Sequence, residues 1–136
     1  MSTTGLQTGQ EARRTLVRAA RVVDAAGTTA DGWVLVVGDT IHATGSGPEA
    51  PAADRVVDLG DAVLTPGFVD LHGHGGATEA YEDDTFDRSL AMHRSHGTTR
   101  SVLSLVANPV PALAASLAHV RAVMATDPLV LGVHLE

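Results

Sequence analysis

The second half of the chain alternates short apolar runs with helical segments, and this order restricts the fold more than any other feature. Apolar runs at 67–71, 99–107 and 129–135 have the length of buried strands. The order strand–helix–strand–helix–strand predicts an α/β fold with parallel strands and right-handed crossovers. Three such strands correspond to an incomplete TIM-type (β/α)₈ barrel, of which these are the first three strands.

Helix signals separate these runs. Thr85 is a candidate N-cap for a helix over 85–96, and Gly97 is a candidate stop. Pro111 suits the first turn of a second helix, in which apolar residues recur at helical spacing until Pro128.

The first half of the chain has a different sequence pattern. Between residues 16 and 64, short apolar runs end at glycine- and aspartate-containing turns, which predicts a small antiparallel, β-sandwich-like domain. Near Pro66 this pattern gives way to the longer alternation of apolar runs and helices. We therefore expect a small β domain over 1–64 and the first βαβαβ part of a barrel over 65–136.

Charge and composition exclude several classes of function. The net charge is −7 and the basic residues form no cluster, so binding to nucleic acid is not expected. The chain has no cysteine, so histidine and carboxylate side chains would have to hold any metal. The polar start from Met1 to Arg14 lacks the apolar core of a signal peptide, and no run is long enough to span a bilayer, so a cytoplasmic location is expected.

Three polar residues stand where strands are predicted to end. His72 and His74 follow the first buried run and point to the same side, because alternate residues of an extended chain do so. Glu136 follows the third run, and the carboxyl ends of parallel strands share one edge. These three side chains could share a zinc-like cation. A lone His-x-His pair is also compatible with a purely structural role.

Asp70 leaves two readings open, since it could orient a ligating histidine or satisfy nearby backbone groups. The remaining histidines outside these strings, His42, His93, His96 and His119, are expected to have structural roles.

Longer strings carry a family resemblance. Residues 65–74, Thr-Pro-Gly-Phe-Val-Asp-Leu-His-Gly-His, resemble the first-strand signature of the amidohydrolase superfamily. The strings at 74–76, 96–99 and 132–136 (His-Gly-Gly, His-Gly-Thr-Thr and Gly-Val-His-Leu-Glu) resemble the N-acetylglucosamine-6-phosphate deacetylase family. The resemblance runs from about Leu16 to Glu136. It departs where the family often has glycines and this chain has Ala77-Thr78-Glu79, and the chain stops where the family continues with Gly-Pro.

This resemblance implies that His72, His74 and Glu136 bind one or two divalent ions, with zinc as the expected metal. It further implies hydrolysis of the acetamide of N-acetylglucosamine 6-phosphate to glucosamine 6-phosphate and acetate, with this amino-sugar phosphate as the small-molecule partner. The family's aspartate base, two further histidine ligands and sugar-binding residues fall beyond residue 136. We therefore expect a truncated chain that is inactive by itself, while the full-length enzyme could be a homo-oligomer.

Two alternatives remain. One is an amidohydrolase of the D-aminoacylase or dihydroorotase type, which usually has lysine where Glu136 stands, and this chain contains no lysine. The other is a non-catalytic, truncated metal-binding fragment.

Overall fold

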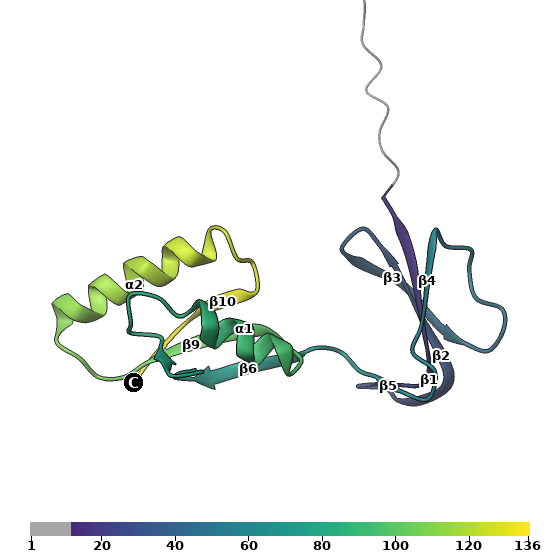
Figure 1. The fold of residues 1–136 in the computed structure, drawn as a ribbon, viewed down its shortest axis with the longest axis horizontal. Helices are drawn as coiled ribbons and strands as arrows, with labels where there is room; N and C mark the ends of the chain where they lie inside the picture. The colour runs from purple at the N-terminus through teal and green to yellow at the C-terminus, as the bar shows by residue number, and fades with distance from the viewer. Residues whose placement is uncertain (1–11) are drawn as a thin grey trace, which may run out of the picture. The chain divides into compact units, whose positions relative to one another are not determined.

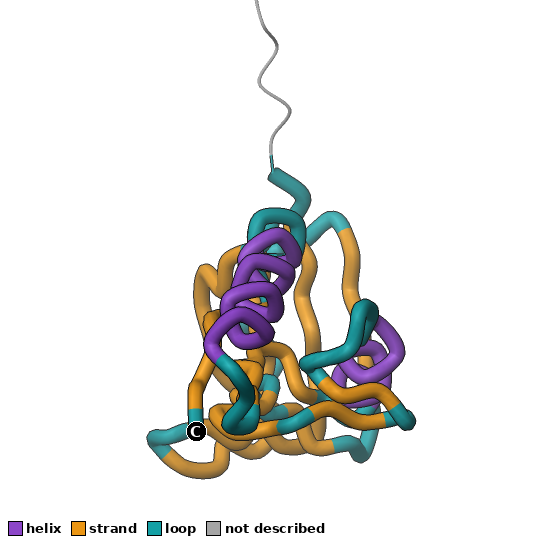
Figure 2. Tube along the Cα trace, turned by 90° about the vertical axis from the view of Figure 1, so that its left-hand side faces the viewer, coloured by secondary structure: helices purple, strands orange, loops and turns teal. Residues whose placement is uncertain are grey.

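The computed structural model describes residues 12–136 of the chain, so the prediction about a signal peptide falls mostly outside it. The chain divides into two compact units, Met1–Pro66 and Gly67–Glu136 (Figure 1). Helices, strands and loops are distinguished by colour in Figure 2. No helix among the described residues is long and apolar enough to cross a membrane.

The first unit is built on one mixed sheet. Its strands are β1 (Arg14–Asp24), β2 (Gly27–Val37), β3 (Thr40–Ser46), β4 (Arg55–Asp58) and β5 (Val63–Leu64). They follow the order β3-β2-β1-β4, and β5 also pairs with β1. The hairpins β1–β2 and β2–β3 are antiparallel as predicted, but β4 and β5 run parallel to β1. The prediction of an antiparallel sheet was therefore wrong for β4 and β5. Segment 47–54 crosses from β3 at one edge of the sheet to β4 on the far side of β1, so β4 does not form a hairpin with β3.

The second unit contains a three-stranded parallel sheet. Its elements are β6 (Phe68–Gly73), β7 (Gly75–Gly76), β8 (Glu79–Ala80), α1 (Asp87–Ser95), β9 (Thr98–Leu105), α2 (Val110–Met124) and β10 (Val130–Leu135). The strand order is β10-β9-β6, and both pairings are parallel, as the sequence predicted. The short strands β7 and β8 form a separate antiparallel hairpin.

Both helices pack on the same face of this sheet. Leu103 and Leu105 of β9 are fully buried and point to one side, since they are two residues apart. They share a core cluster with Leu90 of α1, Val120 of α2 and Val130 of β10. The intervening residue of β9, Ser104, therefore points to the face of the sheet opposite the helices, and it is also fully buried.

Two local predictions were wrong. Thr85 does not cap α1; the helix begins after Phe86, and the Glu79 carboxylate accepts hydrogen bonds from the backbone N–H groups of Arg88 and Ser89 at 2.9 and 3.1 Å. The first strand is not buried on both faces either, because Phe68 and Leu71 are 63% and 67% exposed. This strand is an edge of the three-stranded sheet, so it has a neighbour on one side only.

Gly75 supplies a sharp test of the β7–β8 hairpin. Its φ is +128°, and a Cβ atom there would lie 2.1 Å from the backbone oxygen of Glu79. We expect Gly75→Ala to lower the free energy of unfolding by about 1–3 kcal/mol, the usual range for a disfavoured backbone conformation. Urea unfolding monitored by circular dichroism measures this change.

Gly132→Ala is the matched control in the same unit. Gly132 lies in β10, and a Cβ atom there would meet nothing within 4 Å. We expect a change within about 0.5 kcal/mol, as for most substitutions away from special sites. Equal losses for the two variants would contradict the hairpin geometry.

Candidate metal centre

The structure brings the three residues predicted from the sequence to one edge of the parallel sheet. His72 lies in β6, His74 follows that strand, and Glu136 follows β10. The Nε2 atom of His72 is 2.6 Å from Oε1 of Glu136 and 3.1 Å from Nε2 of His74. His74 Nε2 is 3.6 Å from the same Glu136 oxygen. The three side chains therefore converge at the carboxyl ends of their strands.

Backbone hydrogen bonds hold both sides of this cluster. The N–H of Glu136 donates to the carbonyl oxygen of Leu105 at 3.2 Å, which extends the β9–β10 pairing by one residue. On the other side, the Asp70 carboxylate accepts a hydrogen bond of 3.1 Å from the N–H of His72. Of the two readings of Asp70, the structure supports the satisfaction of a backbone group. This contact also fixes the backbone that carries the His72 ring.

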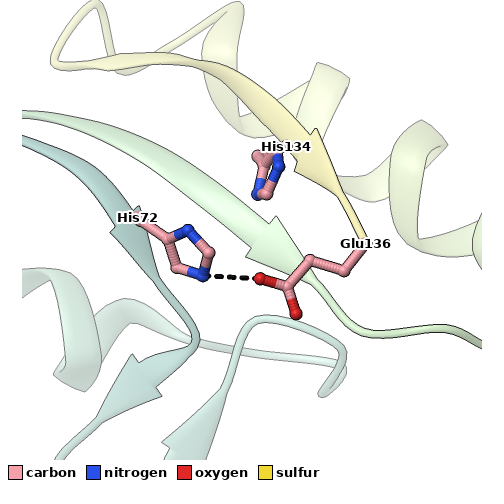
Figure 3. A group of neighbouring side chains, drawn as sticks. All are labelled: His72, His134 and Glu136. Atoms are coloured by element: carbon pink, nitrogen blue, oxygen red, sulfur yellow. Dashed lines mark ion pairs between the residues drawn. The ribbon is translucent and has the colours of Figure 1, made fainter.

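His134 also belongs to the cluster, although the sequence reasoning gave it no role of its own. One ligand atom from each of His72, His134 and Glu136 lies within 4.8 Å of the others (Figure 3). The ring centroids of His72 and His134 are 4.9 Å apart. The sequence did contain the signal, because His134 and Glu136 are two residues apart on an extended segment and thus share a face.

The donor set fits a divalent cation of the zinc type. Imidazole nitrogen and carboxylate oxygen are standard zinc ligands, and two donors on one tetrahedral ion lie about 3.3 Å apart for bonds of about 2.05 Å. The observed separations of 2.6–3.6 Å scatter around that value. The side chains of His72 and Glu136 are 53% and 38% exposed, so a direct ion pair between them contributes little to stability.

Three further histidines of the second unit contact nearby groups of the local structure. His93 of α1 is 3.0 Å from the carbonyl oxygen of Gly75, and the ring of His119 stands edge-on to Phe86 at a centroid distance of 5.1 Å. His96 follows the end of α1, where its Nδ1 atom is 2.9 Å from the carbonyl oxygen of Met92. His42 is an exposed residue of β3.

The loop that follows His74 is anchored at several points. The Glu82 carboxylate accepts a 2.7 Å hydrogen bond from the N–H of Val106, just beyond β9. The N–H of Tyr81 donates to the carbonyl oxygen of His74 at 3.3 Å. Between these anchors, Ala77 and Thr78 have positive φ angles of 50° and 71°. Non-glycine residues therefore adopt the left-handed conformation where the sequence departs from the glycine-rich family pattern.

Comparison with known proteins tests the family resemblance found in the sequence. A crystal structure of N-acetyl-D-glucosamine-6-phosphate deacetylase from Mycobacterium smegmatis is 35% identical, with a TM-score of 0.79 over 90% of this chain. A mutant of the same enzyme, in complex with N-acetyl-D-glucosamine-6-phosphate, is 33% identical with a TM-score of 0.80. The deacetylase from Thermotoga maritima, at 24% identity and a TM-score of 0.73, shows the fold alone.

The resemblance to N-acetylglucosamine-6-phosphate deacetylases is confirmed. The chain spans about a third of the length of these enzymes, 32% and 35% of the two Mycobacterium smegmatis chains. The structure is mixed α/β and mostly strands, and its structural neighbours have the amidohydrolase fold.

Among curated proteins, the imidazolonepropionase of Streptomyces griseus is 46% identical over 44 residues. That match covers 32% of this chain and 11% of the relative. No protein-family model matches the chain.

Tyr81 ties the loop beside the site to the core. Its ring is buried and stands edge-on to Phe86, with centroids 5.6 Å apart. Burial raises the pKa of the Tyr81 phenol above its ordinary value, and the nearby Ser89 hydroxyl acts in the opposite direction. Burial is the larger of these two effects on the pKa.

This raised pKa predicts a loss of stability at high pH. Above about pH 10 the unfolded chain releases the phenol proton more readily than the folded chain, so the free energy of unfolding falls as pH rises. Tyr81→Phe should remove this part of the fall. Because Tyr81 is the only tyrosine of the chain, its ultraviolet absorbance gives the titration directly, beside urea unfolding over the same pH range. A phenol that titrates at its ordinary pKa in the folded chain would contradict the prediction.

Proposed function

We propose that His72, His74 and Glu136 bind a divalent metal ion, zinc in the first instance, as part of a hydrolase site. The observation that carries this proposal is the convergence of two imidazoles and one carboxylate at the carboxyl ends of β6 and β10, with separations of 2.6–3.6 Å. Metal dependence of amidohydrolase-type relatives supports it. The geometry accommodates one ion, and a second ion would need ligands outside these three.

The reaction that this site supports best is hydrolysis of an amide. When bound, a divalent ion lowers the pKa of a water ligand and polarises a carbonyl group. Glu136 and the histidines would hold this ion at the exposed edge of the sheet. A general base must also accept the proton of the water and deliver it to the leaving nitrogen. The resemblance implies that this base is an aspartate beyond residue 136. It implies that two further histidine ligands of the metal also lie beyond that residue.

We infer that the substrate is N-acetylglucosamine 6-phosphate and that the products are glucosamine 6-phosphate and acetate. The support is the likeness to the Mycobacterium smegmatis deacetylase, whose mutant was solved with this sugar phosphate. The activity is proposed for a protein of the deacetylases' length, of which this chain spans about a third. We expect no acetate release from these 136 residues alone, because the resemblance implies a base and sugar-binding residues that they do not include.

A cyclic amide is the second candidate substrate. The imidazolonepropionase match has the higher local identity, 46%, but over 44 residues only. Its name points to an imidazolone ring, a cyclic amide of the kind that other amidohydrolases open. The two candidates share the metal chemistry and differ in the substrate pocket, so a substrate assay separates them.

The metal site can be tested directly on the 136-residue chain. Titration with Co²⁺, followed by its visible absorption, should show one ion bound per chain. Glu136→Gln and His72→Gln should each weaken binding at least about tenfold, since even supporting groups of metal sites are worth about 10–100-fold. His42→Gln is the control, because His42 is exposed in the other unit. Equal binding by all four proteins would contradict the proposed site.

A test of substrate specificity requires a protein of the full length of these deacetylases. With Zn²⁺ present, we expect acetate release from N-acetylglucosamine 6-phosphate, loss of turnover in Glu136→Gln, and little change in His119→Gln. Coupled assay of acetate measures all three. A longer protein that binds metal but opens an imidazolone ring, and leaves the acetamide intact, would move the assignment to the second candidate.

A further inference from the structure

Ser104 places a fully buried hydroxyl against His134, one of the histidines of the candidate metal centre. The residue is 0% exposed and lies in β9, on the face of the sheet opposite the helices. Its Cα partner in the parallel pairing with β10 is His134. The Oγ atom of Ser104 is 3.3 Å from Nδ1 of His134, which is the one hydrogen-bond partner of this hydroxyl among residues 12–136.

The direction of this hydrogen bond follows from burial. If Nδ1 donated, the hydroxyl proton of Ser104 would remain buried without an acceptor, at a cost of about 1–3 kcal/mol. If the hydroxyl donates, both atoms are satisfied. We therefore assign Ser104 as the donor and Nδ1 of His134 as the acceptor. A neutral imidazole whose Nδ1 accepts carries its proton on Nε2.

This tautomer changes what His134 can do in the cluster. A protonated Nε2 has no lone pair for a metal ion, although the position of the ring would otherwise allow ligation. Its Nε2–H is instead a hydrogen-bond donor, on a ring whose centroid lies 4.9 Å from that of His72. Figure 3 shows the His134 ring next to these two side chains, with the ion pair drawn between the other two.

We propose that His134 donates a hydrogen bond from Nε2 to an acyl oxygen of a ligand bound beside His72 and Glu136, and that Ser104 is the positioning residue that fixes this tautomer. The ligand class is an amide or a carboxylate. A fixed donor directed at such an oxygen stabilises the negative charge that develops there during acyl transfer. The identity of this ligand rests on the proposed function. The direction of the Ser104–His134 hydrogen bond depends on no ligand.

The tautomer can be measured without metal. In the ¹⁵N-labelled chain at alkaline pH, where imidazoles are neutral, long-range ¹H–¹⁵N spectra should show His134 protonated at Nε2. Ser104→Ala should shift the ring to a mixture of tautomers, and Ser104→Thr, which keeps the hydroxyl, should retain the wild-type signature. Protonation at Nδ1 in the wild type, or an unchanged ring in Ser104→Ala, would overturn the assignment.

Binding of ¹¹³Cd²⁺ separates this inference from the metal site itself. The spectra should show cadmium coupling to ring nitrogens of His72 and His74 and none to His134. Coupling to His134 would overturn the donor role. Absence of cadmium binding would reject the metal site, while the metal-free spectra would still decide the Ser104–His134 assignment.

Acetate serves as a simple acyl probe of the cadmium-loaded chain. His134→Phe, which removes the donor, should weaken acetate binding about fivefold to tenfold, as expected for one hydrogen bond. His134→Gln, which keeps an N–H donor, should recover part of the affinity. Equal acetate affinity in the wild type and His134→Phe would overturn the ligand role of His134.

Discussion

The parallel pairing of β9 with both β6 and β10 is the constraint on which the candidate site depends. Parallel strands end at the same edge, so residues far apart in the sequence meet there without any specific long-range motif. The register also decides which side chains face the site. A shift of one residue in β10 would turn His134 and Glu136 to the helix-covered face and would bring Val133 and Leu135 to the site. Val130 of β10 opposes such a shift, because it is buried in the same core cluster as Leu103 and Leu105 of β9.

Much of this second unit could be predicted from the sequence. Apolar runs of strand length, proline at a helix start and glycine at a helix stop are local signals, and the structure contains the expected elements. The placement of His72 and Glu136 at one edge followed from the strand order alone. Ligation of metal remains a prediction, since it depends on chemistry that the fold does not determine.

What the sequence missed depends on contacts between distant residues. The cap of α1 comes from Glu79, which is not adjacent to the helix, so the local pattern favoured Thr85. The parallel direction of β4 depends on the path of a connecting segment, which no periodicity encodes. Ser104 looked like an ordinary strand residue. Its role emerges only once the register sets it opposite His134 and burial leaves its hydroxyl a single partner.

The division of the chain into consecutive units has a consequence for its biosynthesis. In the first unit, β1 pairs with β2, with β4 and lastly with β5, which ends at Leu64. The sheet can therefore be completed on the ribosome soon after that residue has emerged, while β9 and β10 are still being translated. Domains commonly fold as units in this order during synthesis. The candidate metal centre, by contrast, cannot form until Glu136 has left the exit tunnel.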